Sequence, residues 1–407
     1  MKSLDLDHVR SFFPALESDW IFMDNAGGTQ TVKQVADRIS DYLLNTNVQL
    51  GASYDVSVQS GARVEEAQQK WAEVINASPA EVAFGSSTTM LLQSLSRSFA
   101  QVVQPGDEVI VTNCDHEANI GPWLRLQEKG VTVRSWNINP KTYTLELSDL
   151  ERLMTSKTRL VAFTHVSNIL GTINPVKEIT SFVHKHGALV CVDGVAYAPH
   201  RLVDVKDWDV DFYVFSLYKV YGPHYALLYG KQKHFEVLPG INHFFIDEIP
   251  YKLQPGNVNY ELSFGLLGIT DYFQSLFARQ NITGLKKYHD RLKVVFDMIA
   301  QHEEVLSAKL LDFLVSKPGV KIIGESSADK DLRVPTISFV VKDRVSSDIT
   351  REVDRSKIGI RYGDFYARRL IDKLGYSSRD GIVRVSMVHY NTPGEVEKLI
   401  RALDAII

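Results

Sequence analysis

The sequence predicts an α/β fold, in which a large domain with a mostly parallel sheet precedes a smaller α+β domain. Three observations support this: helical and strand patterns alternate in the first part of the chain, the strands are short and apolar, and the pattern changes near residue 260. Short apolar strands that alternate with helices are typical of a parallel sheet covered on both faces. In such sheets, ligands bind at the carboxyl ends of the strands.

The elements of the large domain can be followed along the chain. Helical stretches, with apolar residues at three- and four-residue spacing, lie at residues 32–44, 62–75, 91–99 and 176–184. Short β-branched runs that predict strands lie at residues 108–112, 131–136, 160–166, 189–192, 212–215 and 226–229.

A second set of elements follows residue 260. It comprises two long amphipathic stretches at 262–278 and 283–315, short strands at 321–323, 336–341 and 382–387, and helices at 347–355 and 393–405. The last helix begins with a threonine cap followed by proline, Thr392-Pro393. We expect an N-terminal segment (1–20) that packs with the small domain, a large domain (21–265) and a small C-terminal domain (266–407).

Composition restricts the function classes. The 407 residues are 44% hydrophobic and 23% charged, which is ordinary for a globular protein. The formal net charge of −4 gives no overall field that would attract nucleic acid or anionic lipid. The sequence has no apolar run of membrane-spanning length, and its acidic start does not resemble a secretory signal. We therefore expect a cytoplasmic protein with neither nucleic-acid nor membrane partners.

Several common site signatures are missing from the sequence. The two cysteines, Cys114 and Cys191, are too few for a disulfide framework or a cysteine-based zinc site, and we expect no metal. The sequence has no G-x-G-x-x-G after a strand, no Walker A loop, no G-x-S-x-G and no H-E-x-x-H. Nicotinamide, ATP, α/β-hydrolase and zincin functions therefore lack their usual motifs.

An acid and an amine stand at the ends of two predicted strands. Asp193 ends one strand, and Lys219 follows a later one. A lysine amine forms Schiff bases, and a carboxylate can hold a protonated pyridine nitrogen. Pyridoxal phosphate (PLP) needs this pair. Taken alone, however, the two residues fit a turn and a solvated surface lysine equally well.

Three further loops at strand ends carry polar residues. Residues 85–89, Gly-Ser-Ser-Thr-Thr, lead into a helix expected near Met90, and they fit either a phosphate site or a plain helix cap. His116 can stack on a flat cofactor or form structural hydrogen bonds. Asn168 can bind a cofactor oxygen or shape a turn. Together these loops supply an anion site, an imidazole, an acid and an amine.

This combination resembles the class V aminotransferase group of fold-type I PLP-dependent enzymes, close to the cysteine desulfurases. The matching motifs occur in the family's order over nearly the whole chain. They are Asp24-Asn25-Ala26, Ser87-Thr88-Thr89, His116-Glu117-Ala118-Asn119, Ser167-Asn168-Ile169, Val192-Asp193-Gly194, Ser216-Leu217-Tyr218-Lys219, Gly256-Asn257 and Arg384-Val385-Ser386. The resemblance implies a seven-stranded sheet in the large domain and a homodimer.

The resemblance also implies roles for individual residues. Lys219 would form the Schiff base and later move the substrate α-proton, Asp193 would pair with the pyridine nitrogen, and His116 would stack on the ring. Cofactor contacts are further implied for Ser87, Thr88, Thr89, Asn168, Ser216, Tyr218 and Asn257, the last reaching the phosphate of the neighbouring subunit. Substrate contacts are implied for Asn25, Arg361, Tyr366 and Arg384, with Arg384 on the carboxylate.

The chain departs from the cysteine desulfurases at two positions. Their Arg-x-Gly-x-x-Cys-Ala motif aligns with residues 361–367 and puts Tyr366 where they carry the persulfide cysteine. A phenol with a pKa near ~10 cannot replace a thiolate as sulfur acceptor. Ala196 stands where relatives place Gln or His near the cofactor's phenolic oxygen. The Ser-x-Tyr-Lys motif resembles a branch whose members are lyases, epimerases and enzymes that form carbon–carbon bonds.

We therefore expect a PLP-dependent enzyme that acts on an α-amino acid through an external aldimine, without a persulfide cysteine, in a lyase, decarboxylase or epimerase-type reaction. The alternative is a true aminotransferase with a keto-acid acceptor. A catalytically silent scaffold is a third interpretation, but it would have no chemical need for Lys219, Asp193 and His116 together. Selectivity is expected to depend on the loops at 49–57, 243–253 and 364–369.

Overall fold

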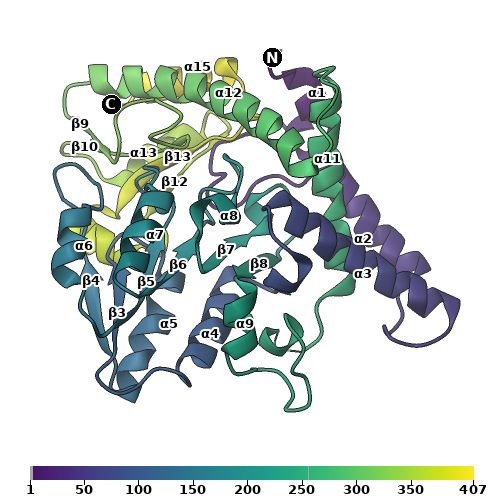
Figure 1. The fold of residues 1–407 in the computed structure, drawn as a ribbon. Helices are drawn as coiled ribbons and strands as arrows, with labels where there is room; N and C mark the ends of the chain where they lie inside the picture. Colours follow the sequence, from purple (N-terminus) through teal and green to yellow (C-terminus); the bar gives the residue numbers. More distant parts are fainter. Residues whose placement is uncertain (1–2, 255) are drawn as a thin grey trace.

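The computed structural model describes residues 3–254 and 256–407 and contains a large, mostly parallel sheet at its centre (Figure 1). This seven-stranded sheet has the order β2-β8-β7-β6-β5-β3-β4. The run from β7 to β4 is parallel, and β8 is antiparallel to both of its neighbours. The strands are β2 (Val82–Gly85), β3 (Glu108–Thr112), β4 (Thr132–Trp136), β5 (Thr158–Thr164), β6 (Leu189–Asp193), β7 (Phe212–Ser216) and β8 (Ala226–Gly230). The predicted α/β fold is confirmed.

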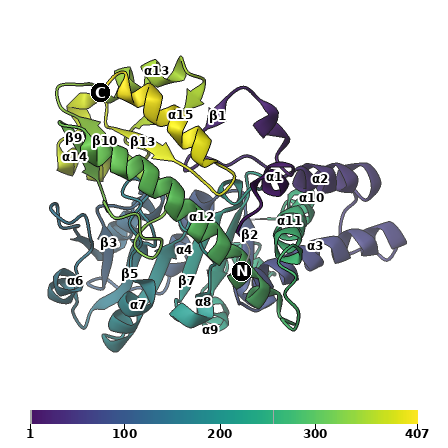
Figure 2. The same cartoon turned by 90° about the horizontal axis from the view of Figure 1, so that it is seen from above.

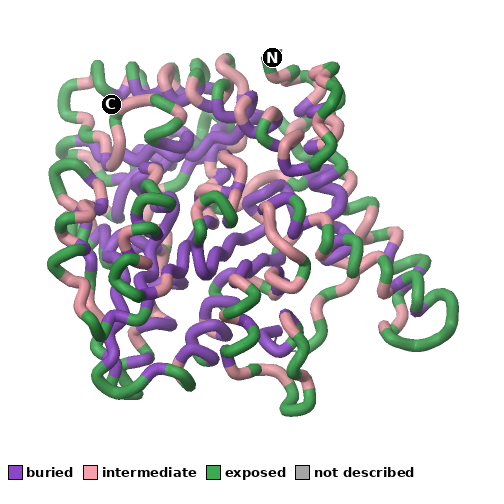
Figure 3. Tube along the Cα trace, viewed as in Figure 1, coloured by how far each residue is buried: buried purple, intermediate pink, exposed green. Residues whose placement is uncertain are grey.

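Helices cover both faces of this sheet because successive strand residues point to opposite sides. In β3, Val109 and Val111 pack with residues of α4 (Thr88–Phe99) and α5 (Gly121–Leu124). The residue between them, Ile110, packs into a second cluster with α3 (Asp55–Val74) and α7 (Val176–Lys185). Apart from the edge strand β4, the strands are therefore mostly buried from both sides, as Figure 3 shows along the sheet.

A second sheet of four antiparallel strands follows, in the order β12-β13-β10-β9. Figure 2 shows the long helix α12 and helix α15 lying together over it. The elements are α12 (Tyr288–Ser316), β9 (Val320–Ile323), β10 (Thr336–Val341), α13 (Ser346–Asp354), β12 (Arg361–Gly363), α14 (Arg368–Leu374), β13 (Ile382–Ser386) and α15 (Pro393–Asp404). A short parallel pair, β1 (Ile21–Phe22) with β11 (Ile358–Gly359), joins the N-terminal part of the chain to this region.

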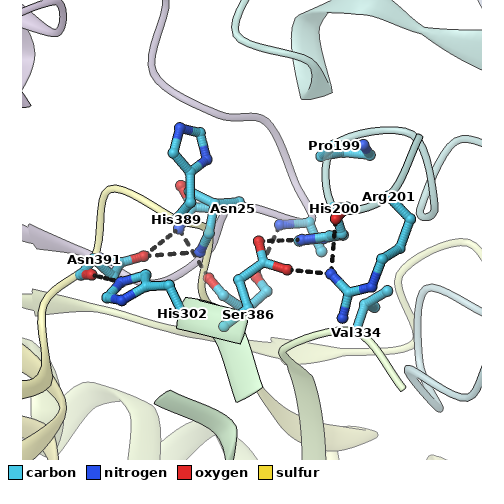
Figure 4. A network of polar contacts seen from close by, with 12 residues as sticks. Asn25, Pro199, His200, Arg201, His302, Val334, Ser386, His389 and Asn391 are labelled. Atoms are coloured by element: carbon cyan, nitrogen blue, oxygen red, sulfur yellow. Dashed lines mark hydrogen bonds and ion pairs between the residues drawn. The ribbon is translucent and has the colours of Figure 1, made fainter. Parts of the chain in front are cut away.

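Buried polar contacts connect these parts (Figure 4). The carboxylate of Glu303 on α12 is fully buried; it accepts a hydrogen bond from Arg201 Nη1 at 2.7 Å and lies 2.9 Å from His200 Nδ1. Arg201 and His200 follow β6, so the contact ties α12 to the large sheet. The predicted domain division at residues 20 and 265 stays a prediction.

Some helices differ from the sequence prediction. Helix α3 begins at Asp55, whereas the sequence predicted a start at residue 62. The prediction missed the first two turns because they are mostly polar and show no apolar periodicity. The stretch predicted at 262–278 forms two helices, α10 (Tyr260–Gly265) and α11 (Leu267–Ala278). Here Gly268 lies against α2 (Lys33–Asn45), where an added Cβ would be 2.5 Å from the Val35 backbone nitrogen.

The remaining helices are short and connect the larger elements. They are α1 (Leu6–Arg10), α6 (Leu147–Leu153), α8 (Val205–Trp208) and α9 (Gln232–Val237). In the described part of the chain, no helix combines the length and the apolar composition that a membrane span requires.

Candidate active site

A cavity lies at the carboxyl ends of the central strands. Parallel strands end at one edge of the sheet, so the loops after them converge there. The predicted cofactor residues that line the cavity are Ser87, Thr88, Thr89, His116, Asn168, Asp193, Ser216, Tyr218 and Lys219. Loops spread over more than 130 positions of the sequence thus meet in one site.

Lys219 and Asp193 are the buried charges of this cavity. Lys219 follows β7 and is 6% exposed; burial, and then the charge of Arg384, lowers its pKa from 10.5 to about 8. Asp193 ends β6, and burial raises its pKa to about 6, although the Val195 N–H and Lys219 act in the opposite direction. The lysine is therefore a better nucleophile near neutral pH than an exposed lysine, because more of it is uncharged.

The 85–89 turn places the N-terminus of α4 at the cavity. The Oγ of Ser87 caps α4 by accepting the Met90 N–H at 3.2 Å, so this helix begins at Thr88, two residues before the predicted start. Thr88 Oγ1 lies 2.6 Å from Ser216 Oγ on β7. Unpaired N–H groups at a helix N-terminus, together with hydroxyl donors, favour a phosphate.

His116 is held as a neutral ring. Its Nδ1 accepts the Ala118 N–H at 3.0 Å, which leaves the ring proton on Nε2. Burial and, to a smaller extent, the charge of Lys219 lower the pKa of His116 to about 4. The loop behind it is anchored by Asp115, whose carboxylate accepts hydrogen bonds from Asn119 Nδ2 at 2.6 Å and from the Thr164 N–H at 3.0 Å. The sequence prediction missed Asp115, although it immediately precedes His116.

The predicted substrate residues lie beside the cavity. Arg384 on β13 is 2% exposed; its Nη1 donates to the Asn168 carbonyl oxygen at 3.2 Å, and the Phe365 ring covers its guanidinium with 3.8 Å from Cζ to the ring centroid. Arg361 lies opposite it on β12. Among the described residues, the cavity lining includes neither arginine nor Tyr366. The guanidinium of Arg384 is therefore buried beside the cavity, with one face covered by Phe365.

Two other predicted residues lie away from the cavity. The amide of Asn25 bonds to protein groups, donating to the Ser386 and Phe22 carbonyl oxygens at 2.9 and 3.0 Å (Figure 4 shows the contact with Ser386). Asn257 lines a separate hollow that includes Gly85, next to the phosphate-type turn. The preceding Pro255 lies outside the described residues.

The 363–369 loop is fastened over His116. The carbonyl oxygen of Phe365 accepts Asn168 Nδ2 at 2.8 Å, and that of Tyr366 accepts the Glu117 N–H at 2.8 Å. Arg369 adds a two-pronged ion pair with Glu117 at 2.9 and 3.0 Å. Phe365 and Tyr366 both adopt positive φ angles, +51° and +62°, which large side chains rarely do. The exposed Tyr366 ring lies 5.2 Å from that of His116.

The two thiols are buried elsewhere. Cys114 and Cys191 are 1% and 0% exposed, and neither is among the described residues that line the cavity. Burial raises the pKa of both thiols, and the Asp115 carboxylate raises that of Cys114 further. Both are therefore protonated, poorly reactive thiols.

The residues fit PLP. The cavity supplies an anion site, a buried carboxylate, a neutral imidazole and a lysine with a lowered pKa, which correspond to the phosphate, ring nitrogen, ring face and aldehyde of that cofactor. Two buried polar atoms, Asn168 Oδ1 and Arg384 Nε, also lack a hydrogen-bond partner among the described residues. A buried polar atom without a hydrogen-bond partner lowers the stability of the fold, unless a bound ligand supplies that partner.

Comparisons with known proteins agree with this arrangement. The family model described as Aminotransferase class-V matches residues 21–274 and 278–399. The chain is 45% identical to the aminotransferase-like protein FGM3 of Gibberella zeae, covering 100% of this chain and 99% of that protein. It is 36% identical to the cysteine desulfurase-like protein ustD of Aspergillus flavus, covering 99% and 91%. The structure of the cysteine desulfurase CsdA from Escherichia coli superposes with a TM-score of 0.84 at 25% identity, covering 99% and 98%. The chain belongs to the class V aminotransferase family and is a PLP-dependent enzyme of the cysteine desulfurase-like type.

Proposed function

We propose that this enzyme cleaves or exchanges a bond at Cα or Cβ of an α-amino acid, in a lyase, decarboxylase or epimerase-type reaction that uses no persulfide. The carrying observation is the loop above His116, which presents Tyr366, while both cysteines are buried away from the cavity. Sulfur transfer through a protein persulfide needs an accessible thiolate near the substrate. A phenol at that position supports chemistry in which no sulfur is accepted.

In the proposed reaction, different residues of the site bind the cofactor and transfer the proton. PLP, when bound, supplies an electron sink for negative charge that develops at the substrate Cα. We assign covalent attachment and proton transfer to Lys219 Nζ, and the contact with the ring nitrogen to Asp193. The α4 N-terminus holds the phosphate, with its hydroxyl partners Thr88 and Ser216.

Substrate binding is assigned to the neighbouring arginine. A guanidinium suits a carboxylate because its N–H donors lie in one plane and can bind both oxygens. Arg384 has an unpartnered Nε among the described residues, and Asn168 links it to the cavity lining. We propose that the substrate α-carboxylate binds Arg384 along the edge of the guanidinium, which the Phe365 ring leaves uncovered.

Two assays on the PLP-loaded protein test this function. With L-cysteine, we expect no sulfide or protein persulfide above the level of a Lys219→Ala variant. With a panel of amino acids in D₂O, we expect the wild type, but not Lys219→Ala, to incorporate deuterium at Cα or to release a product from at least one of them. Persulfide on either cysteine would overturn the proposal. Accumulation of pyridoxamine phosphate with a keto acid would instead identify a true aminotransferase.

We further propose a homodimer with composite active sites. The support is the Gly256-Asn257 motif, which resembles the family motif whose asparagine reaches the phosphate of the neighbouring subunit. In this chain, Asn257 lines a hollow that borders its own 85–89 turn. In this proposal, Asn257 reaches the phosphate bound by the other subunit.

A further inference from the structure

Asp24 joins the two arginines beside the cavity. Its Oδ1 accepts a hydrogen bond from Arg384 Nη2 at 3.0 Å, and its Oδ2 pairs with Arg361 Nε at 2.8 Å. The arginines are directly opposite each other in the antiparallel pair β12–β13. Like charges in that position repel. The carboxylate of Asp24, which comes from the segment after β1, lies between them and offsets this repulsion.

The same contact fixes the direction of Arg384. A guanidinium is planar and has five N–H donors. Nη2 is held by Asp24, Nη1 by the Asn168 carbonyl oxygen, and one face of the plane by the Phe365 ring. These contacts leave Nε–H buried and unpartnered among the described residues. Because the ring covers the face, the edge of the plane remains for a carboxylate.

We propose that Asp24 is the positioning residue of the substrate-carboxylate site: it aligns the Arg384 plane and neutralises Arg361, so that one carboxylate binds the remaining donors of Arg384. This inference rests on the proposed function, in which Arg384 binds the substrate α-carboxylate. Asp24 itself is not among the described residues that line the cavity, so it acts through the arginines.

The charge of Asp24 also reaches Lys219. Burial and Arg384 lower the pKa of the lysine, Asp193 and Asp24 raise it, and Arg361 lowers it. Loss of the Asp24 charge should therefore lower the pKa of Lys219 further. A general loosening of the site would have the opposite effect, since solvent would relieve the burial that lowers this pKa.

Two probes isolate the carboxylate. Phosphopyridoxyl-glycine and phosphopyridoxyl-methylamine differ only by that group, and both bind to the cofactor-free protein without turnover. We expect the wild type to bind the glycine adduct at least about tenfold more tightly than the methylamine adduct, the effect of one charge-assisted hydrogen bond or more. In Asp24→Asn, we expect this preference to fall about tenfold, because an amide can accept from only one arginine and presents a donor to the other.

Three controls make the outcome specific. Asp24→Glu keeps the charge and should retain most of the preference, and Asp37→Asn, which removes the acid of an exposed ion pair with Lys33 on α2, should leave it unchanged. Labelling of Lys219 by an acylating reagent across a pH series should show a lower midpoint in Asp24→Asn than in the wild type. If Asp24→Asn unfolds, the Asp24→Glu result decides: loss of the preference despite the retained charge would contradict the proposal.

The possible results separate the two claims. If the wild type discriminates and Asp24→Asn discriminates equally well, the positioning role is wrong while the proposed function stands. If the Lys219 midpoint rises in Asp24→Asn, the variant has loosened the site and the positioning role is likewise overturned. If the wild type binds both probes equally, Arg384 does not bind the carboxylate, and the proposed function fails at that residue.

Discussion

Burial determines the chemistry of single residues in this site. Lys219 and His116 both have lowered pKa values because a charged form is poorly solvated there, and because each lies near another cation. The same physical cause leaves the lysine partly uncharged and the imidazole neutral. Cys114 and Cys191 show the converse, since burial keeps a thiol protonated.

The lowered pKa of Lys219 predicts the pH dependence of cofactor attachment. Only the uncharged amine attacks an aldehyde. In cofactor-free protein, the rate of PLP attachment should therefore rise with pH and level off above about 8. The measurement is the growth of the cofactor absorbance, followed by borohydride reduction and peptide mapping. A midpoint near ~10, the value of an exposed lysine, or a pyridoxyl group on another lysine would contradict the assignment.

The Tyr366 hydroxyl is predicted to be dispensable for proton exchange. Tyr366 is 74% exposed, and in the proposed function Lys219 supplies the base. Tyr366→Phe should retain Cα deuterium exchange within a fewfold of the wild type, measured by mass spectrometry of the recovered amino acid. Loss of exchange would instead make Tyr366 an acid or base in its own right, as in a two-base epimerase.

At the scale of elements, the site depends on turns that fit closely between the two sheets. The turn after β5 contains Gly171, whose φ is +68° and whose added Cβ would lie 2.2 Å from the Thr336 carbonyl oxygen on β10. Asn168, in the same turn, lines the cavity and donates to Phe365. Close packing at Gly171 therefore positions a residue of the cavity lining.

A pair of glycine variants tests this fit. Gly187 also has a positive φ, +76°, but an added Cβ there meets no described atom within 4 Å. Gly187→Ala should cost only the backbone strain, about 1–2 kcal/mol. Gly171→Ala should cost at least ~2 kcal/mol more, because it adds a clash with backbone. Denaturant unfolding followed by tryptophan fluorescence gives both values, and equal costs would show that the turn is free to relax.

The sequence predicted those elements and residues whose position can be recognised from neighbouring residues, such as the end of an apolar strand or the start of a helix. Asp193, Lys219 and Ser87 are at strand ends or a helix start, where position alone indicates a site. The ion pairs Asp24–Arg384 and Glu117–Arg369 had no such signal, because each joins segments more than 250 positions apart. For the same reason the sequence could not show that the Asn25 amide bonds to Ser386 and not to the cavity.

For the whole molecule, the proposed site draws on both sheets. The large sheet supplies the predicted cofactor residues that line the cavity, whereas β12 and β13 supply Arg361 and Arg384, the predicted substrate residues beside it. Buried Glu303 ties α12 to the loop after β6, and the short pair β1–β11 joins the N-terminal part of the chain to the region of the second sheet. We therefore expect substrate and cofactor binding to depend on the relative position of the two sheets.

The proposed dimer adds a dependence on subunit association. If Asn257 contacts the phosphate of the other subunit, cofactor binding and association are thermodynamically linked. Asn257→Glu would place a negative charge against that phosphate, so we predict weaker PLP retention and more monomer on dilution. Sedimentation over a concentration series, with and without PLP, measures both. A fully PLP-loaded wild-type monomer would contradict the composite site.

We propose that Lys219, and no cysteine, carries out the chemistry at Cα. The most direct test is deuterium incorporation at Cα of a reactive amino acid by the doubly substituted Cys114→Ala/Cys191→Ala protein, compared with Lys219→Ala. Because both thiols are buried away from the cavity, we predict that the cysteine-free protein exchanges at a rate within a fewfold of the wild type, whereas Lys219→Ala shows no exchange. A folded, PLP-loaded cysteine-free protein that has lost exchange would show that a cysteine takes part in the chemistry.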